Sequence, residues 1–516
     1  MMLRAMEVGT HVTAGRRRLP DRPCRREMGD TMDPRDYRTV VRARNPRAGD
    51  RRRPPAVPTI VLVVIVMAGA ARAQDAAHAP DDGLPTLHAA LLQEAARANP
   101  ELQAAREAWL AAAAAADASG KLPDPRLSYG RFLAPVQTRV GPQQHQVGLS
   151  QTLPWFGSLG RQRDAAAAAI VAARAGIGAA WLDVRLRLTR ALHEIHRIDR
   201  TLQIERENLE LLEQFESVAR ARLRYNEAAT ADLLRLQVEL GRAEDRVQAI
   251  GDRRAPAVAR LNALLGRPAR APFPQEPVLH DGAVDSLALL EQRLAGGHPR
   301  LRALRAEAER QERLADVARD RGRPGLTLGV MHTFVEPRGV EGLAGDGDDA
   351  TLATVSVNLP LWRGKIAAGV DAAQRRQARV RADERDLRGQ LQADLSAALY
   401  EFDDAGRRVA LYRDTLLPKA EESLGATLDA YANGRSDFGE LIDVERVLLE
   451  FQLSLLEARV DRADARARIA SLAPDPRSLQ AAIALVAGTG PAGGAGDPDR
   501  ALGDPRHQTF EQEMSR

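Results

Sequence analysis

Residues 146–157 read QVGLSQTLPWFG, and residues 353–364 read ATVSVNLPLWRG. In each stretch apolar and polar side chains alternate, and the alternation ends at a Leu-Pro pair followed by an aromatic residue and a glycine. Alternation predicts a strand with one apolar face, and the proline marks the point where the strand ends. The residues that make these two strand-to-helix turns are Pro154, Trp155, Gly157, Pro360, Trp362 and Gly364.

The elements that precede these turns also occur twice in the sequence. The segments 126–130 (RLSYG) and 325–329 (GLTLG) predict an earlier strand in each copy. Each of these strands follows a helix that opens at Asn99-Pro100 or His298-Pro299, where Asn99 can cap the helix. Polar loops, Ala134 to His145 and Glu336 to Ala350, separate the strands of each pair. The chain therefore contains an internal duplication.

Long helices are expected after both turns. There is no proline between Trp155 and Ala255, and only Pro418 lies between Leu361 and Ala473. A helix from Gly160 to Arg224 would be roughly 100 Å long, and its apolar residues recur at the three- and four-residue spacing of a coiled coil. Each long helix meets a break, at residues 225–232 and 431–437, which predicts a hairpin tip and a returning helix.

The sequence divides accordingly into four parts. They are an N-terminal extension with a signal peptide (1–73), a first repeat (74–285), a second repeat (286–473) and a C-terminal tail (474–516) that is expected to be disordered. The expected fold class is mainly α with a small β part.

The N-terminus indicates export. Arg51, Arg52 and Arg53 precede the apolar run 59–70, and Ala71-Arg72-Ala73 follows it, as in a secretory signal peptide with Met32 as a candidate start. Residues 1–73 carry a net charge of +9, which leaves −5 for the rest of a chain whose total is +4. The basic pI of about 9.5 is therefore no sign of nucleic-acid binding by the exported protein.

The exported part lacks cysteine, because Cys24 is the only one in the sequence. Disulfides, thiolate metal sites and a lipid anchor are not expected after cleavage. No later segment is expected to cross a membrane as a helix, so membrane entry would require a closed β-barrel.

The duplicated order of helix, strand, loop, strand, long helix, tip and return helix resembles the TolC-like outer-membrane efflux proteins, and within them the heavy-metal branch that includes CzcC and CusC. The resemblance covers roughly residues 84–472. It implies a homotrimer in which each chain gives four strands to one 12-stranded barrel, with a helical tunnel in the periplasm. It also implies two partners, a periplasmic adaptor and an inner-membrane pump of the resistance-nodulation-division (RND) type, and a location in the outer membrane lipid of a Gram-negative bacterium.

The hairpin tips are the candidate functional site that the resemblance implies. The residues expected to line the periplasmic entrance are Tyr431, Arg435, Glu440, Asp443, Tyr225 and Asp232. The residues expected to contact the adaptor are Asn226, Glu227, Thr230, Asn433, Gly434, Ser436 and Asp437. Three copies of an acidic residue around a pore would attract cations. The alternative is that these acids are helix caps and solvated faces, and a cap is the favoured role of Asp437.

Other motifs carry weaker hypotheses. His193 and His196 do not complete an H-E-x-x-H motif, and ordinary positions on a solvated helix are favoured over zinc binding. Residues 346–349 (DGDD) lack the spacing of a calcium loop and fit a flexible acidic loop. Trp155, Phe156 and Trp362 lie where a membrane boundary is expected, although packing at the bend would explain them equally.

No catalytic residue, cofactor or resident metal is expected. The sequence contains no Walker loop, no G-x-S-x-G and no dinucleotide fingerprint. The resemblance implies a passive efflux channel that binds no nucleotide and exports heavy-metal cations. Multidrug efflux and type I secretion remain alternatives within the fold, and a soluble periplasmic coiled-coil scaffold is the alternative outside it.

Overall fold

The protein is described here as a computed structural model that covers residues 86–224, 230–280 and 282–488. The signal peptide, Cys24 and Met32 lie outside the described residues. So do the first-tip residues Tyr225, Asn226 and Glu227, and the tail after residue 488.

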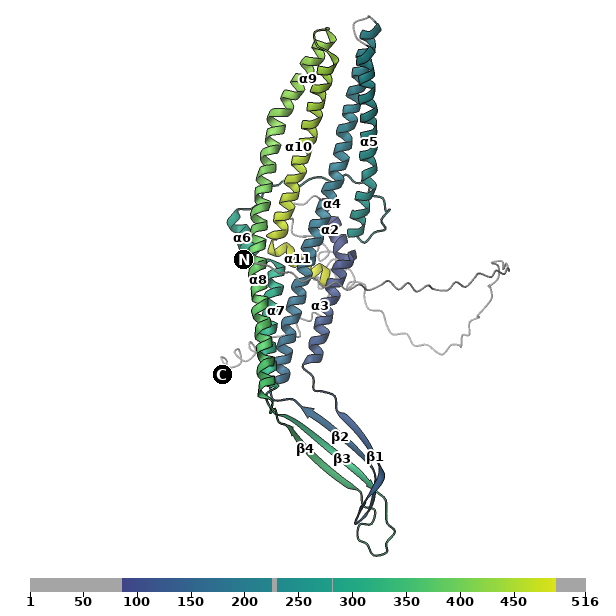
Figure 1. Cartoon of the computed structure of the whole chain (residues 1–516), viewed down its shortest axis with the longest axis vertical. Helices are drawn as coiled ribbons and strands as arrows, with labels where there is room; N and C mark the ends of the chain where they lie inside the picture. The colour runs from purple at the N-terminus through teal and green to yellow at the C-terminus, as the bar shows by residue number, and fades with distance from the viewer. Residues whose placement is uncertain (1–85, 225–229, 281, 489–516) are drawn as a thin grey trace, which may run out of the picture. The chain divides into compact units, whose positions relative to one another are not determined.

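The described elements follow the same order in both halves of the chain (Figure 1). The first half contains α2 (Thr86–Ala98), α3 (Pro100–Ser119), β1 (Arg126–Thr138), β2 (Gly141–Leu153), α4 (Ser158–Arg224) and α5 (Thr230–Leu264). The second contains α6 (Leu287–Gly297), α7 (Pro299–Asp320), β3 (Gly325–Val335), β4 (Ala350–Asn358), α8 (Arg363–Leu411), α9 (Leu417–Ala432), α10 (Phe438–Leu472) and α11 (Pro476–Ala487). The prediction of a mainly helical chain with a small β part is confirmed.

The four strands form one antiparallel sheet in the order β1-β2-β3-β4. The two halves meet in its centre, where β2 pairs with β3 from Gln143↔Val335 to Leu153↔Leu326. β1 and β4 are the outer strands, so each has one side that pairs with no other described strand. An open edge of this kind offers backbone donors and acceptors to another chain.

The two faces of the sheet differ in chemistry. Register places Leu127, Leu149 and Val330 in one row across β1, β2 and β3. The large apolar side chains of this face are between 37% and 73% exposed: Leu127, Tyr129, Val147, Leu149, Leu328, Val330, Val355 and Val357. The opposite face carries mostly small or polar residues, including Ser128, Gly148, Ser150, Gly329, Thr327, Thr354 and Ser356. The apolar face is therefore exposed, and no described residue of this chain covers it.

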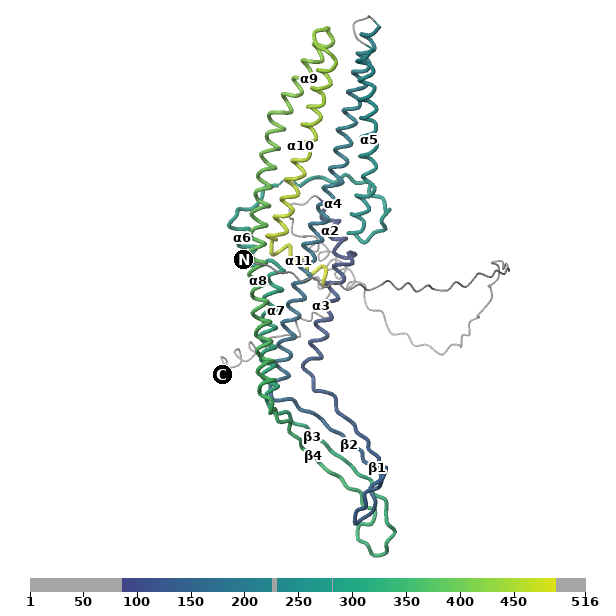
Figure 2. Tube along the Cα trace, in the orientation of Figure 1, coloured from purple at the N-terminus to yellow at the C-terminus, as the bar shows by residue number. Residues whose placement is uncertain are grey.

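The long helices pack along one another to make the core. α4 runs for 67 residues without a break and packs against α3, α5, α7 and α10 (Figure 2). Ile177, Val184, Leu188 and Ile195 of α4 are fully buried at four- and seven-residue spacing. At the start of α3, Asn99 caps the helix as predicted, since its Oδ1 accepts from the backbone N–H groups of Glu101 and Leu102.

The matching long helix of the second half is interrupted. A π-helical turn, Tyr412–Leu416, separates α8 from α9, and the N–H of Leu417 bonds to the carbonyl of Tyr412 five residues earlier. Pro418 has no N–H for the normal helical bond, which accounts for a break at this point.

Three expectations need correction. Most of the predicted loop 134–145 is strand, because β1 and β2 continue to a two-residue turn at Arg139-Val140. Residues 476–487 of the predicted disordered tail form α11, whose N-cap is Asp475. No membrane-spanning helix was expected, but among the described residues one helix, α4, is long and apolar enough to cross a membrane. In the most apolar stretch of α4, 39% of the residues are buried inside the described structure.

Candidate functional site at the hairpin tips

The second tip is a tight helix-to-helix turn. At the end of α9, the N–H of Gly434 bonds to the carbonyl of Tyr431 and the N–H of Arg435 bonds to that of Ala430. Gly434 has φ of +69°, a left-handed conformation that glycine adopts without a steric cost. Asp437 then caps α10 by accepting from the N–H of Glu440 at 2.8 Å, so its predicted role as a cap is confirmed.

Tyr431 is part of the core of the tip and does not line an open surface. Its side chain is only 2% exposed, and its ring packs edge-on against Phe438 with the centroids 5.8 Å apart. Burial raises the pKa of its hydroxyl. The expectation that Tyr431 lines the entrance is therefore wrong for this conformation, because the bulky ring is needed to fill the space between the helices.

The acidic residues predicted at the second tip lie on an exposed face. Asp437, Glu440 and Asp443 line one shallow groove together with Ala420 and Ser423 of α9. The Asp443 side chain is 77% exposed and lies 3.5 Å from Arg446, while Glu440 accepts from the Ser436 hydroxyl at 2.6 Å. A short surface pair such as Asp443–Arg446 contributes little stability. These carboxylates are thus free to face a partner or a lumen.

The remaining predicted tip residues divide between the two hairpins. Asn433, Gly434 and Arg435 are exposed at the second tip. Thr230 is exposed at the start of α5, whereas Asp232 is half-buried in the first turn of that helix. The Asp232 carboxylate is close enough to Tyr431 to raise the pKa of its hydroxyl further. Asp232 therefore belongs to the contact between the tips.

A buried ionic layer joins the two hairpins behind the tips, and sequence reasoning did not find it. Glu445 of α10 is 4% exposed and lies beside Asn208 of α4. Glu205 of α4 is 3% exposed and accepts from Arg246 of α5 at 3.0 Å. Burial raises the pKa of Glu445 to about 7. Glu445 and Glu205 occupy positions where a coiled coil normally has apolar residues. A charged residue at such a position in the sequence is the signal that could have predicted this buried layer.

The strand-to-helix turns hold their aromatic side chains outward. Phe156 is 86% exposed and Trp362 is 79% exposed, so packing at the bend does not explain them within this chain. Trp155 is 37% exposed, with the Arg323 guanidinium 5.9 Å from its ring. Gly157 has φ of +76° and Pro154 and Pro360 end the strands, as the turn motif predicts, while Gly364 lies in the first turn of α8.

The helix histidines are structural. His193 is 3% exposed and its Nδ1 lies 2.5 Å from Asp464 of α10, and His196 donates from Nδ1 to the carbonyl of Pro277 at 2.7 Å. The expectation of a solvated helix face is wrong, because both rings tie α4 to neighbouring segments. Within the described ranges no group of three or more His, Cys, Asp or Glu side chains could hold a metal ion.

The acidic loop after β3 also has a structural role. The Asp346 carboxylate accepts from the N–H groups of Arg338 and Gly339, both at 2.8 Å. Asp349 accepts from the N–H of Val335 at 2.9 Å. These carboxylates therefore order the loop backbone.

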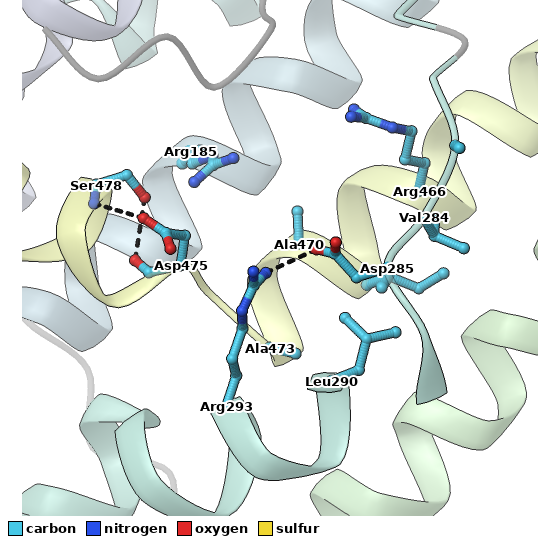
Figure 3. A pocket seen from close by; sticks show the side chains of 12 residues that line it. Arg185, Val284, Asp285, Leu290, Arg293, Arg466, Ala470, Ala473, Asp475 and Ser478 are labelled. Carbon is cyan, nitrogen blue, oxygen red and sulfur yellow. Dashed lines mark hydrogen bonds and ion pairs between the residues drawn. The ribbon is translucent and has the colours of Figure 1, made fainter. Parts of the chain in front are cut away.

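A cavity of about 330 Å³ lies among α4, α6, α10 and the start of α11 (Figure 3). Three of its charged residues are engaged with one another or with the backbone. Arg293 donates to Asp285 at 2.8 Å, and Asp475 accepts from the N–H of Ser478 at 2.9 Å. Nothing in this arrangement presents a nucleophile beside a general base, so the cavity offers no catalytic group in place.

Comparison with known proteins agrees with this architecture. Residues 290–473 match the model of the family described as Outer membrane efflux protein. The outer membrane protein VceC of Vibrio cholerae shares the fold with a TM-score of 0.62 and 18% identity, over 76% of this chain and 97% of that one. A search of curated proteins gave no match.

Two further solved structures show the same fold. CusC, a transmembrane channel, has a TM-score of 0.64 and 17% identity, over 75% of this chain and 92% of that one. The CmeC outer membrane channel of Campylobacter jejuni has a TM-score of 0.62 and 13% identity, over 80% of this chain and 88% of that one. The matched family and these neighbours are channels and not enzymes. The chain thus has the TolC-like fold of outer-membrane channels, and its residues 290–473 carry the sequence of the outer membrane efflux protein family.

Proposed function

We propose that this chain is one subunit of a homotrimeric outer-membrane channel, the passive exit duct of a tripartite efflux system. In this proposal the sheet of each chain joins two others in a closed barrel, and the helices form the periplasmic duct. A periplasmic adaptor binds the channel, and an RND-type pump in the inner membrane supplies the energy for transport. The cargo is a heavy-metal cation.

The observation that carries the proposal is the sheet. It has an exposed apolar face, a polar opposite face and two edges that pair with no strand in the described part of the chain. Four strands cannot close a barrel alone, and a lipid environment does not tolerate an open edge. Pairing β4 of one chain with β1 of the next satisfies both edges and turns the apolar faces outward.

Two neighbouring residues of β4 provide a matched test of this orientation. Val355 is 68% exposed on the apolar face, and Ser356 is its neighbour on the polar face. A charge on a lipid-facing position of a barrel is destabilising, by roughly 2–4 kcal/mol for Arg or Lys near the midplane and by less for Asp, whereas a lumen-facing position tolerates it. We therefore expect Val355→Asp to prevent assembly in the membrane fraction, and Ser356→Asp to assemble normally.

The readout is cell fractionation followed by sizing of the detergent-extracted protein. A trimer from the outer-membrane fraction, lost only in Val355→Asp, would support the proposal. A soluble periplasmic monomer for the unmodified chain would overturn it and favour the coiled-coil scaffold. Equal behaviour of the two variants would overturn the assignment of the faces.

The cargo needs a separate experiment. A deletion strain, with and without a complementing copy, is grown across graded zinc, cobalt, cadmium, copper and silver, with a drug panel alongside. Selective metal sensitivity that the intact gene reverses would support metal export. Sensitivity to drugs or detergents alone would favour the multidrug alternative, and a secretion defect without either sensitivity would favour a type I secretion duct.

A further inference from the structure

The region where the strands meet the helices concentrates positive charge. We define the junction belt as residues 121–126, 155–164, 316–323 and 359–365, which lie at the sheet end of α3, α4, α7 and α8 (Figure 1). These residues contain nine basic and four acidic side chains, a net charge of +5. The loop end of the sheet, residues 131–145 and 336–349, contains three basic and five acidic side chains, a net charge of −2. The charge is therefore asymmetric along the strands.

Part of the positive charge is balanced within the belt. Asp320 is buried and forms ion pairs with Arg161 and Arg323, and Arg319 pairs with Asp316. Other basic side chains of the belt are exposed, and no ion pair joins them to another residue in the described part of the chain: Arg126, Arg321, Arg363 and Lys365. Their charge is available to an external anion.

The same belt exposes large apolar side chains. Phe156, Leu359, Leu361 and Trp362 are between 65% and 86% exposed, although each lies within a few residues of a basic side chain. They continue the exposed apolar face of the sheet toward the helices. Aromatic rings beside basic groups, at the end of an apolar surface, match the boundary where hydrocarbon gives way to lipid headgroups.

We propose that the junction belt binds the phosphate headgroups of anionic phospholipids and prefers them to zwitterionic ones. This inference rests on the proposed function, because it requires the apolar face of the sheet to lie in a membrane. Arg321, Arg363 and Lys365 attract the headgroups, and Trp155 and Trp362 lie at the level of the glycerol backbone. A soluble polyanion would gain no contact with the four exposed apolar side chains, so lipid is the favoured occupant.

The tryptophans provide a native probe. The chain has four, and Trp109 and Trp181 are buried at 2% and 7% exposure, which leaves Trp155 and Trp362 accessible. The full-length mature protein is reconstituted in phosphatidylcholine vesicles with a minor fraction of brominated lipid. The brominated lipid is either phosphatidylglycerol or phosphatidylcholine, and quenching of tryptophan fluorescence is compared at equal fraction.

We expect brominated phosphatidylglycerol to quench more strongly than brominated phosphatidylcholine. Each basic residue near an anionic surface favours anionic lipid roughly fivefold. The triple variant Arg321→Gln, Arg363→Gln, Lys365→Gln should therefore reduce this preference more than tenfold. The control is Arg375→Gln, Arg376→Gln, Arg379→Gln, which removes three exposed charges from α8 outside the belt and should keep the preference.

The outcomes separate the two levels of the proposal. Equal quenching by both lipids would overturn the headgroup preference and leave the membrane insertion of the sheet intact. Absence of quenching by either lipid would overturn the insertion itself. A preference that both triple variants lose equally would also overturn the proposal, since it would then reflect overall charge.

Discussion

The guanidinium of Arg222 lies over the ring of Tyr431, with its central carbon 4.6 Å from the ring centroid, and also donates to the backbone carbonyl of Tyr431. Arg222 is in the last turn of α4, and Tyr431 is in the last turn of α9. One side chain thus connects the tips of the two hairpins. The contact combines a cation–π interaction with a charge-assisted hydrogen bond.

Arg222→Gln should loosen the closed arrangement of the tips. The variant loses the cation–π interaction and weakens the bond to the Tyr431 carbonyl, a loss of about 1–3 kcal/mol. The measurement is closed-state conductance in planar bilayers, which should rise. Arg220→Gln is the matched control, because Arg220 pairs with Glu216 on its own helix. An equal rise in both variants would contradict the prediction.

Replacing Glu440 and Asp443 together with alanine should make the closed channel leak small solutes and reduce its preference for cations. Both carboxylates lie on the exposed face of α10, and three copies around an entrance would make a negative ring. The control removes two exposed acids from α9, Glu421→Ala and Glu422→Ala. An unchanged closed-state conductance of the double variant would count against this role.

Glu445→Gln should stabilise the protein at pH 8 and leave its stability unchanged at pH 4.5. The folded-state pKa of Glu445 is about 7, above its ordinary value of 4.5, because the carboxyl is buried. Its ionisation therefore lowers the free energy of unfolding as pH rises from 4.5 to 7, by about 3 kcal/mol in full. Glutamine cannot ionise and has nearly the same size and shape as glutamate.

The test compares thermal unfolding midpoints of the two proteins across this pH range. The groups that face Glu445 are Glu205 and Asn208 of α4, Glu239 and Arg246 of α5, and Arg446 of α10. Glu450→Gln on the exposed face of α10 is the control. A stabilisation of Glu445→Gln that is the same at both pH values would show that titration is not the cause.

His88→Gln should reduce the loss of stability in acid. His88 is 6% exposed and its Nε2 lies 3.0 Å from the Thr189 hydroxyl. Burial lowers the pKa of His88 from 6.5 to about 3. The unfolded chain therefore binds a proton that the folded chain excludes, and stability falls as pH drops from 6.5 toward 3.

Glutamine can bond to Thr189 but takes up no proton, so the slope of stability against pH between 6 and 4 should be shallower in the variant. The slope is measured by chemical denaturation monitored by tryptophan fluorescence. An identical slope in variant and parent would assign acid sensitivity to other groups, of which buried His298, with its pKa lowered to about 4, is the next candidate.

The elements of the fold could be predicted because their signals are local. Alternation in 146–151, the prolines at 154 and 360, and the cap at Asp437 each act within a few residues of their own position. The parts of β1 and β2 that lie beyond residue 131 could not be predicted in this way. Val136 and Gln143 continue the two strands only because they pair with each other. The helix at 476–487 was missed because its Gly- and Pro-rich continuation dominated the composition of that segment.

The site was harder to predict because it depends on contacts between distant segments. Tyr431 is adjacent to exposed residues in sequence, yet Arg222, 209 residues away, and Phe438 enclose its ring. The ion pairs of Glu205 and Arg246 likewise join two helices. A helical wheel shows on which face of its helix a residue lies, but it does not show which other helix packs against that face.

The pairing of β2 with β3 has a kinetic consequence. Leu153 and Leu326 are neighbours in the sheet, although the whole of α4, α5, α6 and α7 lies between them in the chain. Their first contact must close a loop of that length, and formation of non-local pairs of this kind is slow. The hairpins β1-β2 and β3-β4 can each form quickly by themselves. During biogenesis the chain therefore passes through a stage in which the two apolar hairpins have formed but are not yet paired with each other. This stage lasts until the intervening helices have been synthesised and have packed, and it is the stage at which the chain is most prone to aggregate.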